Sequence, residues 1–194
     1  RNSSVTDRLN RAKGANAVGF DHSYARLGPA FSTPQVPDPV SEPRLLLWNQ
    51  NLADTLGWSG DPQSDAAQLA ALAGNTPLRD SHPIATVYAG HQFGQYNPQL
   101  GDGRATLLGE WVTPSGARFD IQLKGAGPTA YSRGGDGRSP IGPVIREYLV
   151  SEAMHTLGVP TTRALAAVAT GEPVIRNQID PGAILTRVAS SHLR

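Results

Sequence analysis

The sequence lacks cysteine altogether. This absence excludes disulfide bonds, thiolate zinc sites and cysteine nucleophiles, and it fits a reducing compartment. The chain also lacks any apolar run near the roughly 18 residues that a membrane-spanning helix needs, so we expect no membrane partner. Its five histidines, at positions 22, 82, 91, 155 and 192, show no HExxH pattern or other close ligand spacing. We therefore expect structural histidines and no metal site within this chain.

Net charge is almost absent, because 17 basic and 16 acidic residues leave a formal charge of +1 at pH 7. A surface that binds nucleic acid usually carries a large basic excess, so we expect no nucleic-acid partner, and any phosphate must be bound by a local cluster of cations. Basic residues dominate the first 13 positions, which suits an organelle transit segment but fits a disordered leader better. We expect a cytoplasmic protein if the source is bacterial, and a mitochondrial one if it is eukaryotic.

Proline and glycine divide the chain into three segments. Prolines at positions 29, 34, 37, 39 and 43 predict an extended arm over residues 1–43 with little secondary structure. Residues 44–82 predict a helical extension, since apolar residues at 45, 46, 48, 52 and 56 follow a helical spacing up to Gly57, and Ser64 suits the cap of a second helix that ends at Gly74. Residues 83–194 hold the remaining motifs and form the third segment.

The third segment alternates between glycine-rich loops and regular elements. Residues 83–103 predict a structured loop, and residues 104–113 and 117–124 predict the two strands of a β-hairpin. A second glycine-rich stretch, 125–142, precedes an amphipathic helix over about 142–157. Two further strands are predicted over 164–176 and 183–190, with a break in the first at 170–173. The expected fold class is therefore α+β, with an antiparallel sheet and one helix packed against it.

A lysine and a glutamate carry the clearest chemical signal. Lys124 ends the predicted strand IQLK, and Glu147 follows 23 residues later on the predicted helix. Protein kinases use this arrangement to grip nucleotide phosphates, the glutamate holding the lysine by an ion pair. Taken alone, Lys124 and Glu147 are more simply interpreted as two solvated surface charges. Helical-wheel geometry favours Glu152 over Glu147 as the lysine's partner, and a buried Glu152 would need a partner such as an arginine.

Short glycine-rich motifs flank this pair. GDGR at 101–104 and KGAG at 124–127 would let backbone amides approach an anion, although two turns with positive φ are the alternative reading. In SRGGDGR, Asp136 is placed to orient an arginine or to contact a ribose or base, unless it simply forms a turn. Arg187 and Arg194 lie seven residues apart near a strand end, and surface placement is the default reading for both.

Taken together, the motifs YAGHQFGQYNPQLGDGRA, DIQLKGAGPTAYSRGGDGR, IREYLVSEAM, LGVPTTRAL and PGAILTRVASSHLR resemble the selenoprotein O family of protein adenylyltransferases, over roughly residues 20–194. The resemblance implies a protein-kinase-like N-lobe whose second lobe is missing from this chain. It implies ATP bound with its phosphates reversed relative to ordinary kinases, and transfer of AMP to serine, threonine or tyrosine hydroxyls of protein substrates. The alternatives are a catalytically silent, pseudokinase-type nucleotide-binding module and phosphoryl transfer to a small molecule.

The resemblance also assigns residues. It implies that Lys124 grips phosphate and that Glu147 is its ion-pair partner. The implied ATP contacts are Gly101, Gly103, Arg104, Lys124, Asp136, Gly137, Arg187 and Arg194. The family's base aspartate and the Asn and Asp that bind Mg or Mn would lie beyond Arg194, so we expect this chain alone to be inactive.

Overall fold

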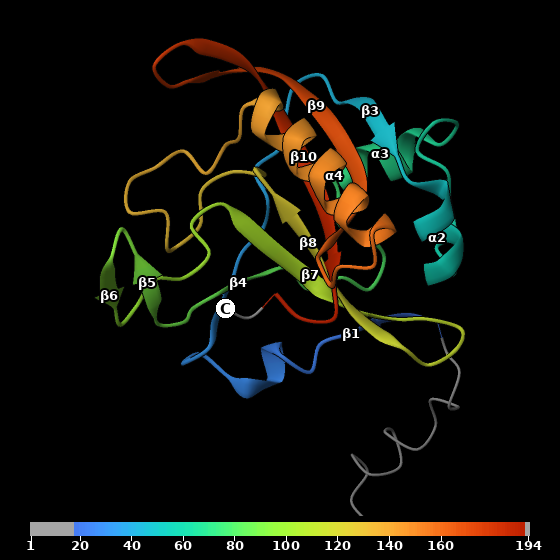
Figure 1. The fold of residues 1–194 in the computed structure, drawn as a ribbon, viewed down its shortest axis with the longest axis horizontal. Coiled ribbons are helices and arrows are strands. Elements are labelled where there is room, and N and C mark those ends of the chain that lie inside the picture. The colour runs from blue at the N-terminus through green and yellow to red at the C-terminus, as the bar shows by residue number, and fades with distance from the viewer. Residues whose placement is uncertain (1–17, 193–194) are drawn as a thin grey trace, which may run out of the picture.

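The computed structural model describes residues 18–192, so the basic N-terminal stretch and Arg194 lie outside the described residues. An eight-stranded antiparallel sheet lies at its centre, with helix α4 on one face and helices α2 and α3 on the other (Figure 1). The sheet strands are β1 (Gly19–Asp21), β2 (Ser32–Pro34), β3 (Arg44–Trp48), β4 (Ile84–Thr86), β7 (Ala105–Val112), β8 (Arg118–Lys124), β9 (Arg163–Ile175) and β10 (Ile179–Ala189). The helices are η1 (Ala25–Leu27, a single 3-10 turn), α2 (Gln50–Leu56), α3 (Ala66–Leu72) and α4 (Ile141–Thr156).

The strand order is β2-β4-β7-β8-β10-β9-β3, with β1 paired to β7. A separate small hairpin, β5 (Gly90–Gln92) and β6 (Gln95–Asn97), stands away from the sheet (Figure 1). The predicted hairpin over 104–124 is confirmed as β7 and β8, and the predicted helix over 142–157 is confirmed as α4. The expected α+β arrangement, an antiparallel sheet with a helix that carries Glu147, is therefore present. Across the described residues, no helix is long and apolar enough to cross a membrane.

Alternation along β8 separates its apolar from its polar side chains. Successive side chains of a strand point to opposite faces of the sheet. Ile121 and Leu123 are fully buried in the larger core, which α2 and α3 cover. Gln122 and Lys124 therefore lie on the face that α4 covers.

Strand β10 brings a third polar side chain to the same face. Ala183 and Leu185 pack against α4 in the smaller core, so alternation places Arg187 on that face as well. The antiparallel register sets Arg187 directly opposite Gln122 of β8. The sheet thus offers Gln122, Lys124 and Arg187 as neighbours beside α4.

The predicted helix over residues 44–48 is wrong, because these residues form strand β3, paired antiparallel with β9. Four consecutive apolar residues suit a strand that packs on both faces, and Pro43 precedes them. Helix α2 starts only after Asn49, whose side-chain oxygen accepts a hydrogen bond from the N–H of Leu52 at 3.1 Å. The segment 44–82 therefore supplies a strand of the main sheet as well as two helices.

Several smaller expectations are also corrected. Residues 18–43 do include the predicted irregular proline-rich stretch, yet β1 and β2 join the sheet. The predicted loop 83–103 contains β4 and the β5–β6 hairpin. Asp65, not Ser64, caps α3 by accepting hydrogen bonds from two backbone N–H groups of its first turn. Strand β9 runs through 170–173 without a break, because a register shift in its pairing with β10 absorbs the irregularity there.

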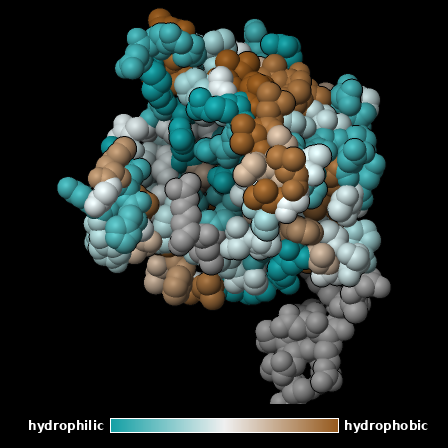
Figure 2. Space-filling view, in the orientation of Figure 1, coloured by the Kyte–Doolittle hydropathy of each residue, from teal (hydrophilic) through white to brown (hydrophobic). Residues whose placement is uncertain are grey.

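Apolar side chains lie on the outer face of α4 as well as on the inner face that packs against the sheet. Leu149, Val150, Met154 and Leu157 are all exposed, and Leu157 is 77% exposed. Figure 2 shows apolar side chains gathered over this helix. Since a helix of this kind has no single apolar stripe, the periodicity alone does not show which side faces the sheet.

Glu152 ties α4 to both β9 and α2. It accepts hydrogen bonds from Nε and Nη2 of Arg163 at 2.9 and 2.8 Å, from the Ala164 N–H at 2.9 Å and from Nδ2 of Asn49 at 2.8 Å. Burial works to raise the pKa of Glu152, but these hydrogen bonds and the charge of Arg163 outweigh it and lower the pKa. The arginine partner expected for a buried Glu152 is present, so Glu152 serves the fold.

Replacing Glu152 by glutamine should lower the free energy of unfolding by about 2 kcal/mol at neutral pH, because a charge-assisted hydrogen-bond cluster is lost. Because the folded-state pKa of Glu152 is lowered, its contribution is complete above the ordinary value of 4.5 and is lost as the pH falls through the folded-state pKa. Urea unfolding of both proteins at about pH 7 and about pH 3 should show a gap that shrinks in acid.

Asp54→Asn is the control, since Asp54 is an exposed carboxylate on α2. It should change the free energy of unfolding by less than about 0.5 kcal/mol. A Glu152→Gln gap of equal size at both pH values would contradict the assigned role of the carboxylate charge.

Candidate functional site

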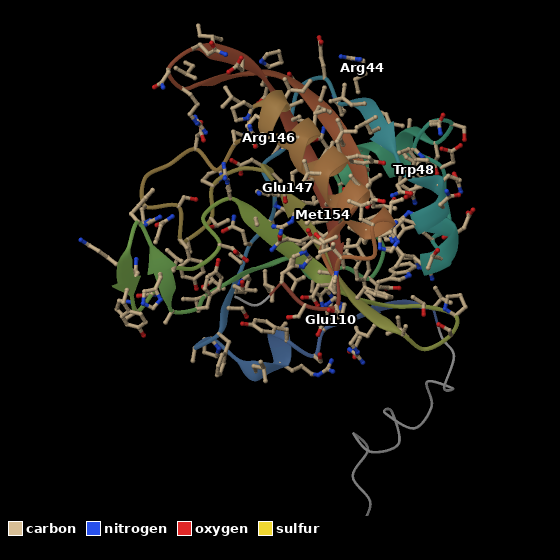
Figure 3. The ribbon with its side chains drawn as sticks, in the orientation of Figure 1. Arg44, Trp48, Glu110, Arg146, Glu147 and Met154 are labelled. Atoms are coloured by element: carbon tan, nitrogen blue, oxygen red, sulfur yellow. The ribbon has the colours of Figure 1, made fainter. Side chains whose placement is uncertain are left out.

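Lys124, Glu147 and Arg187 form one charged cluster beside α4. Nζ of Lys124 donates a hydrogen bond to Oε2 of Glu147, and Nε of Arg187 lies 3.0 Å from Oε1 of the same carboxylate. The three side chains are only 15–28% exposed. Glu147 lies on the edge of α4 that borders the sheet (Figure 3). A single carboxylate therefore holds two cations from two neighbouring strands.

The pKa of Lys124 is lowered. Burial of the ammonium group is the largest cause, and the charges of Arg187 and Arg104 lower the pKa further. The hydrogen bond and the charge of Glu147 act in the opposite direction without cancelling these effects. Because two cations share one carboxylate, the cluster holds more positive charge than Glu147 neutralises, which favours the entry of an anion.

The GDGR turn is fixed by its aspartate. Asp102 accepts hydrogen bonds from Oγ1 of Thr86 at 2.6 Å, from the Tyr88 hydroxyl at 2.9 Å and from Nε2 of Gln122 at 3.2 Å. Its own N–H donates to the Thr86 carbonyl at 2.9 Å. These contacts hold the backbone of Gly101 and Gly103 against the rest of the cleft wall.

Both glycines of this turn are required by close packing. Gly101 has φ +66°, and a Cβ atom there would lie 2.5 Å from a ring carbon of Tyr131. A Cβ atom on Gly103 would lie 2.9 Å from the Tyr131 carbonyl oxygen. The KGAG turn is joined to the same structure, because the Gly125 N–H donates to the Arg104 carbonyl at 2.8 Å. The two glycine motifs are therefore joined through their backbones.

Asp136 has an arginine partner that the sequence did not indicate. Nη1 and Nη2 of Arg176, at the tip of the β9–β10 hairpin, each lie 2.8 Å from an oxygen of Asp136. The Arg138 N–H donates to Oδ1 of Asp136 at 2.9 Å. The pKa of Asp136 is lowered, chiefly by the Arg176 hydrogen bonds. Asp136 does orient an arginine, but the partner is Arg176 rather than one of the two arginines in its own loop.

These elements enclose a cleft of about 330 Å³. Six cationic side chains line it: Arg104, Lys124, Arg133, Arg138, Arg176 and Arg187. Its lining carboxylates are Asp102 and Asp136, and Glu147 contacts two of the cations from α4. A nearly neutral chain therefore concentrates positive charge at one place, as phosphate binding requires.

A larger hollow of about 810 Å³ lies beside β3 and the β9–β10 hairpin. Its charged lining residues are Glu42, Arg44, Glu172 and Asp180. Three carboxylates against one arginine would repel an anion, and most of the remaining lining is proline, glycine and alanine. The smaller cationic cleft is the better candidate site.

The structure brings most of the predicted site residues together. Gly101, Gly103, Arg104, Lys124, Asp136, Gly137 and Arg187 all line the cleft, and Glu147 contacts Lys124 and Arg187. Arg194 lies outside the described residues. The wheel-based choice of Glu152 is wrong, because Arg163 occupies that carboxylate. Over residues 18–192, no group of three or more His, Cys, Asp or Glu side chains is arranged to hold a metal ion.

Comparison with known proteins fits this geometry. A family model described as "Protein adenylyltransferase SelO" matches residues 15–194. The chain is 61% identical over 179 residues to "Protein nucleotidyltransferase YdiU" of Maridesulfovibrio salexigens, which covers 92% of this chain and 36% of that protein. It is 57% identical over 181 residues to the protein of the same name from Bacillus thuringiensis (strain Al Hakam), which covers 92% of this chain and 37% of that protein. This chain thus spans just over a third of the length of these relatives. The chain belongs to the SelO family.

Proposed function

We propose that this chain is the ATP-binding part of a protein adenylyltransferase, a kinase-like N-lobe whose cleft holds the nucleotide. The enzyme would transfer AMP from ATP to serine, threonine or tyrosine hydroxyls of protein substrates. The observation that carries the proposal is the Lys124–Glu147–Arg187 cluster, which faces a cleft with six cationic side chains. Family membership supports it, since the family is described by adenylyl transfer and the relatives are named nucleotidyltransferases.

The cluster suits a triphosphate for electrostatic reasons. Lys124 offers N–H donors from a point charge, whereas the planar guanidinium of Arg187 offers several in a fixed fork. Glu147 keeps both cations in place before the ligand arrives, so little side-chain entropy is lost on binding. Phosphate oxygens would accept charge-assisted hydrogen bonds from these groups and from Arg104, while the glycine turns let the nucleotide approach the backbone closely.

In the proposed reaction, the acceptor hydroxyl oxygen bonds to the α-phosphorus of ATP. The bond from that phosphorus to the oxygen bridging the β-phosphate breaks, pyrophosphate leaves with the electron pair, and the hydroxyl proton passes to a base. An ATP molecule with reversed phosphates would present its α-phosphate to the acceptor. The residues of this chain would hold the nucleotide and stabilise the charge of the pyrophosphate that forms.

The base and the metal site are proposed to lie outside the described residues. Of the carboxylates in and beside the cleft, Asp102 accepts three side-chain hydrogen bonds, Asp136 is bound by Arg176, and Glu147 is bound by two cations. Each carboxylate already has a role, so this set fits neither a general base nor the oxygen ligands that Mg or Mn requires. The relatives' name favours an enzyme over a silent nucleotide-binding module.

Replacing Lys124 by methionine should weaken ATP binding about tenfold or more, because a charge-assisted contact to phosphate is lost while the buried aliphatic stem keeps its packing. Adenosine, which has no phosphate, should bind as before. Glu147→Gln should act in the same direction, since it releases both cations. Calorimetric titration of the intact protein with ATP and with adenosine measures these effects.

Two controls accompany this experiment. Arg118→Ala removes a cation of β8 that pairs with Asp21 outside the cleft, and it should leave both affinities unchanged. Glu152→Gln should lower stability but not the ATP affinity of the folded protein. Wild-type ATP affinity in Lys124→Met would contradict the assignment of Lys124 as a phosphate ligand.

The 194-residue chain alone should transfer no AMP. Its cleft would hold the phosphates from one side, but in this proposal the carboxylates in and beside the cleft would supply neither a base nor a metal site. Incorporation of label from α-labelled ATP into a general protein acceptor, with and without magnesium, is the measurement. Magnesium-dependent incorporation by this chain would show that its catalytic groups lie within residues 1–194.

A further inference from the structure

Gln122 is a buried polar residue that contacts two residues lining the cleft, Asp102 and Arg187. The residue is only 1% exposed. It lies on β8, two positions before Lys124. Its Oε1 accepts a hydrogen bond from Nη1 of Arg187 at 3.0 Å, and its Nε2 donates one to Oδ2 of Asp102 at 3.2 Å. Both ends of the amide are therefore used, and each end meets a charged group.

The two partners make different demands on the residue between them. Arg187 can only donate, and the carboxylate of Asp102 can only accept. An amide supplies the required acceptor on one side and the required donor on the other. A carboxylate would set like charges against each other at Asp102, and an apolar side chain would leave both partners without this contact.

Gln122 also completes a continuous chain of polar contacts. This series of contacts runs from Asp102 through Gln122 to Arg187, and then through Glu147 to Lys124. Asp102 stands in the GDGR turn, and the other members come from β8, β10 and α4. One side chain thus connects the GDGR turn to the cation cluster.

We propose that Gln122 is a positioning residue for phosphate recognition, which aims the Arg187 guanidinium into the cleft and fixes the GDGR turn relative to it. This inference rests on the proposed function, because it takes the phosphates of ATP as the ligand of Arg187. Gln122 itself touches no phosphate in this account. Its loss should affect the ligand parts that carry phosphate and leave the nucleoside contacts intact.

A purely structural role would give a different result. If Gln122 only filled the core, its replacement would lower stability and change the affinities for ATP and adenosine by the same factor. A positioning role predicts selective loss of ATP affinity. The ratio of the two affinities, measured in the folded protein, therefore separates the two roles.

The first test is Gln122→Met, which keeps the length and volume of the side chain and removes both hydrogen bonds. ATP affinity of the intact protein should fall roughly tenfold, with adenosine affinity changed less than about twofold. Thr186→Val is the matched control. Thr186 is fully buried on β10 beside Arg187, and within residues 18–192 its hydroxyl has no hydrogen-bond partner, so this change should leave the ATP affinity unchanged.

A charge-conserving exchange is the second test and covers the case in which Gln122→Met fails to fold. Gln122→Glu alone places a carboxylate against Asp102 and should reduce ATP affinity more than Gln122→Met does. Adding Asp102→Asn places an amide donor against the new carboxylate and returns the number of charges to that of the wild type, with the Thr86 hydroxyl, which now donates to Oδ2 of Asp102, accepting from the amide instead. The double variant should recover ATP affinity to within about threefold of the wild type.

The possible outcomes distinguish the role of Gln122 from the proposed function. Equal ATP affinity in wild type and Gln122→Met, or parallel loss of ATP and adenosine, would overturn the positioning role while leaving the proposed function standing. A double variant no better than Gln122→Glu would overturn the claim that the Asp102 contact matters. A wild-type protein that binds adenosine but gains nothing from the phosphates would overturn the proposed function, and the role of Gln122 with it.

Discussion

The site depends on one carboxylate shared by two cations. Lys124 and Arg187 come from neighbouring strands and would repel each other if Glu147 were not between them. Glu147 in turn reaches this position only because α4 packs on the sheet with Ala183 and Leu185 beneath it. The cation cluster is therefore a product of helix docking, and any change that shifts α4 should disturb it.

The same helix carries a second glutamate with a separate task. Glu152 lies five positions after Glu147, so it leaves the helix in a different direction and reaches Arg163, Ala164 and Asn49. This contact set ties α4 to β9 and to the start of α2. Glu152 thus holds α4 in place, and Glu147, on the same helix, holds Lys124 and Arg187 beside the cleft.

Much of this arrangement could be predicted from the sequence. Strict alternation in ARFDIQLK and the short turn before it predicted the β7–β8 hairpin, and the strand-end lysine with a helix glutamate predicted the Lys124–Glu147 pair. Geometry on a helical wheel favoured Glu152 over Glu147 and was wrong, because the pairing depends on which cation lies opposite each glutamate. Arg163 on β9 is the deciding residue, and only the tertiary structure places it there.

Other parts were not predictable for physical reasons. The run 45–48 is apolar without a period, so it suits a buried strand and a helix equally well, and its pairing with β9 decides the matter. Arg176 lies 40 residues from Asp136, and nothing local marks the two as partners. In the sequence, Gln122 is an ordinary polar position of an alternating strand. Its contact with Arg187 depends on the register that sets Arg187 opposite it on β10.

This cleft is proposed to recognise a nucleotide chiefly through its phosphates. The most direct measurement is the affinity of the wild-type protein for adenosine, AMP, ADP and ATP, by calorimetry in one buffer of fixed ionic strength. Affinity should rise with each added phosphate, by roughly tenfold or more between adenosine and ATP, because each phosphate contacts further cationic donors. Equal affinity for adenosine and ATP would contradict the proposal.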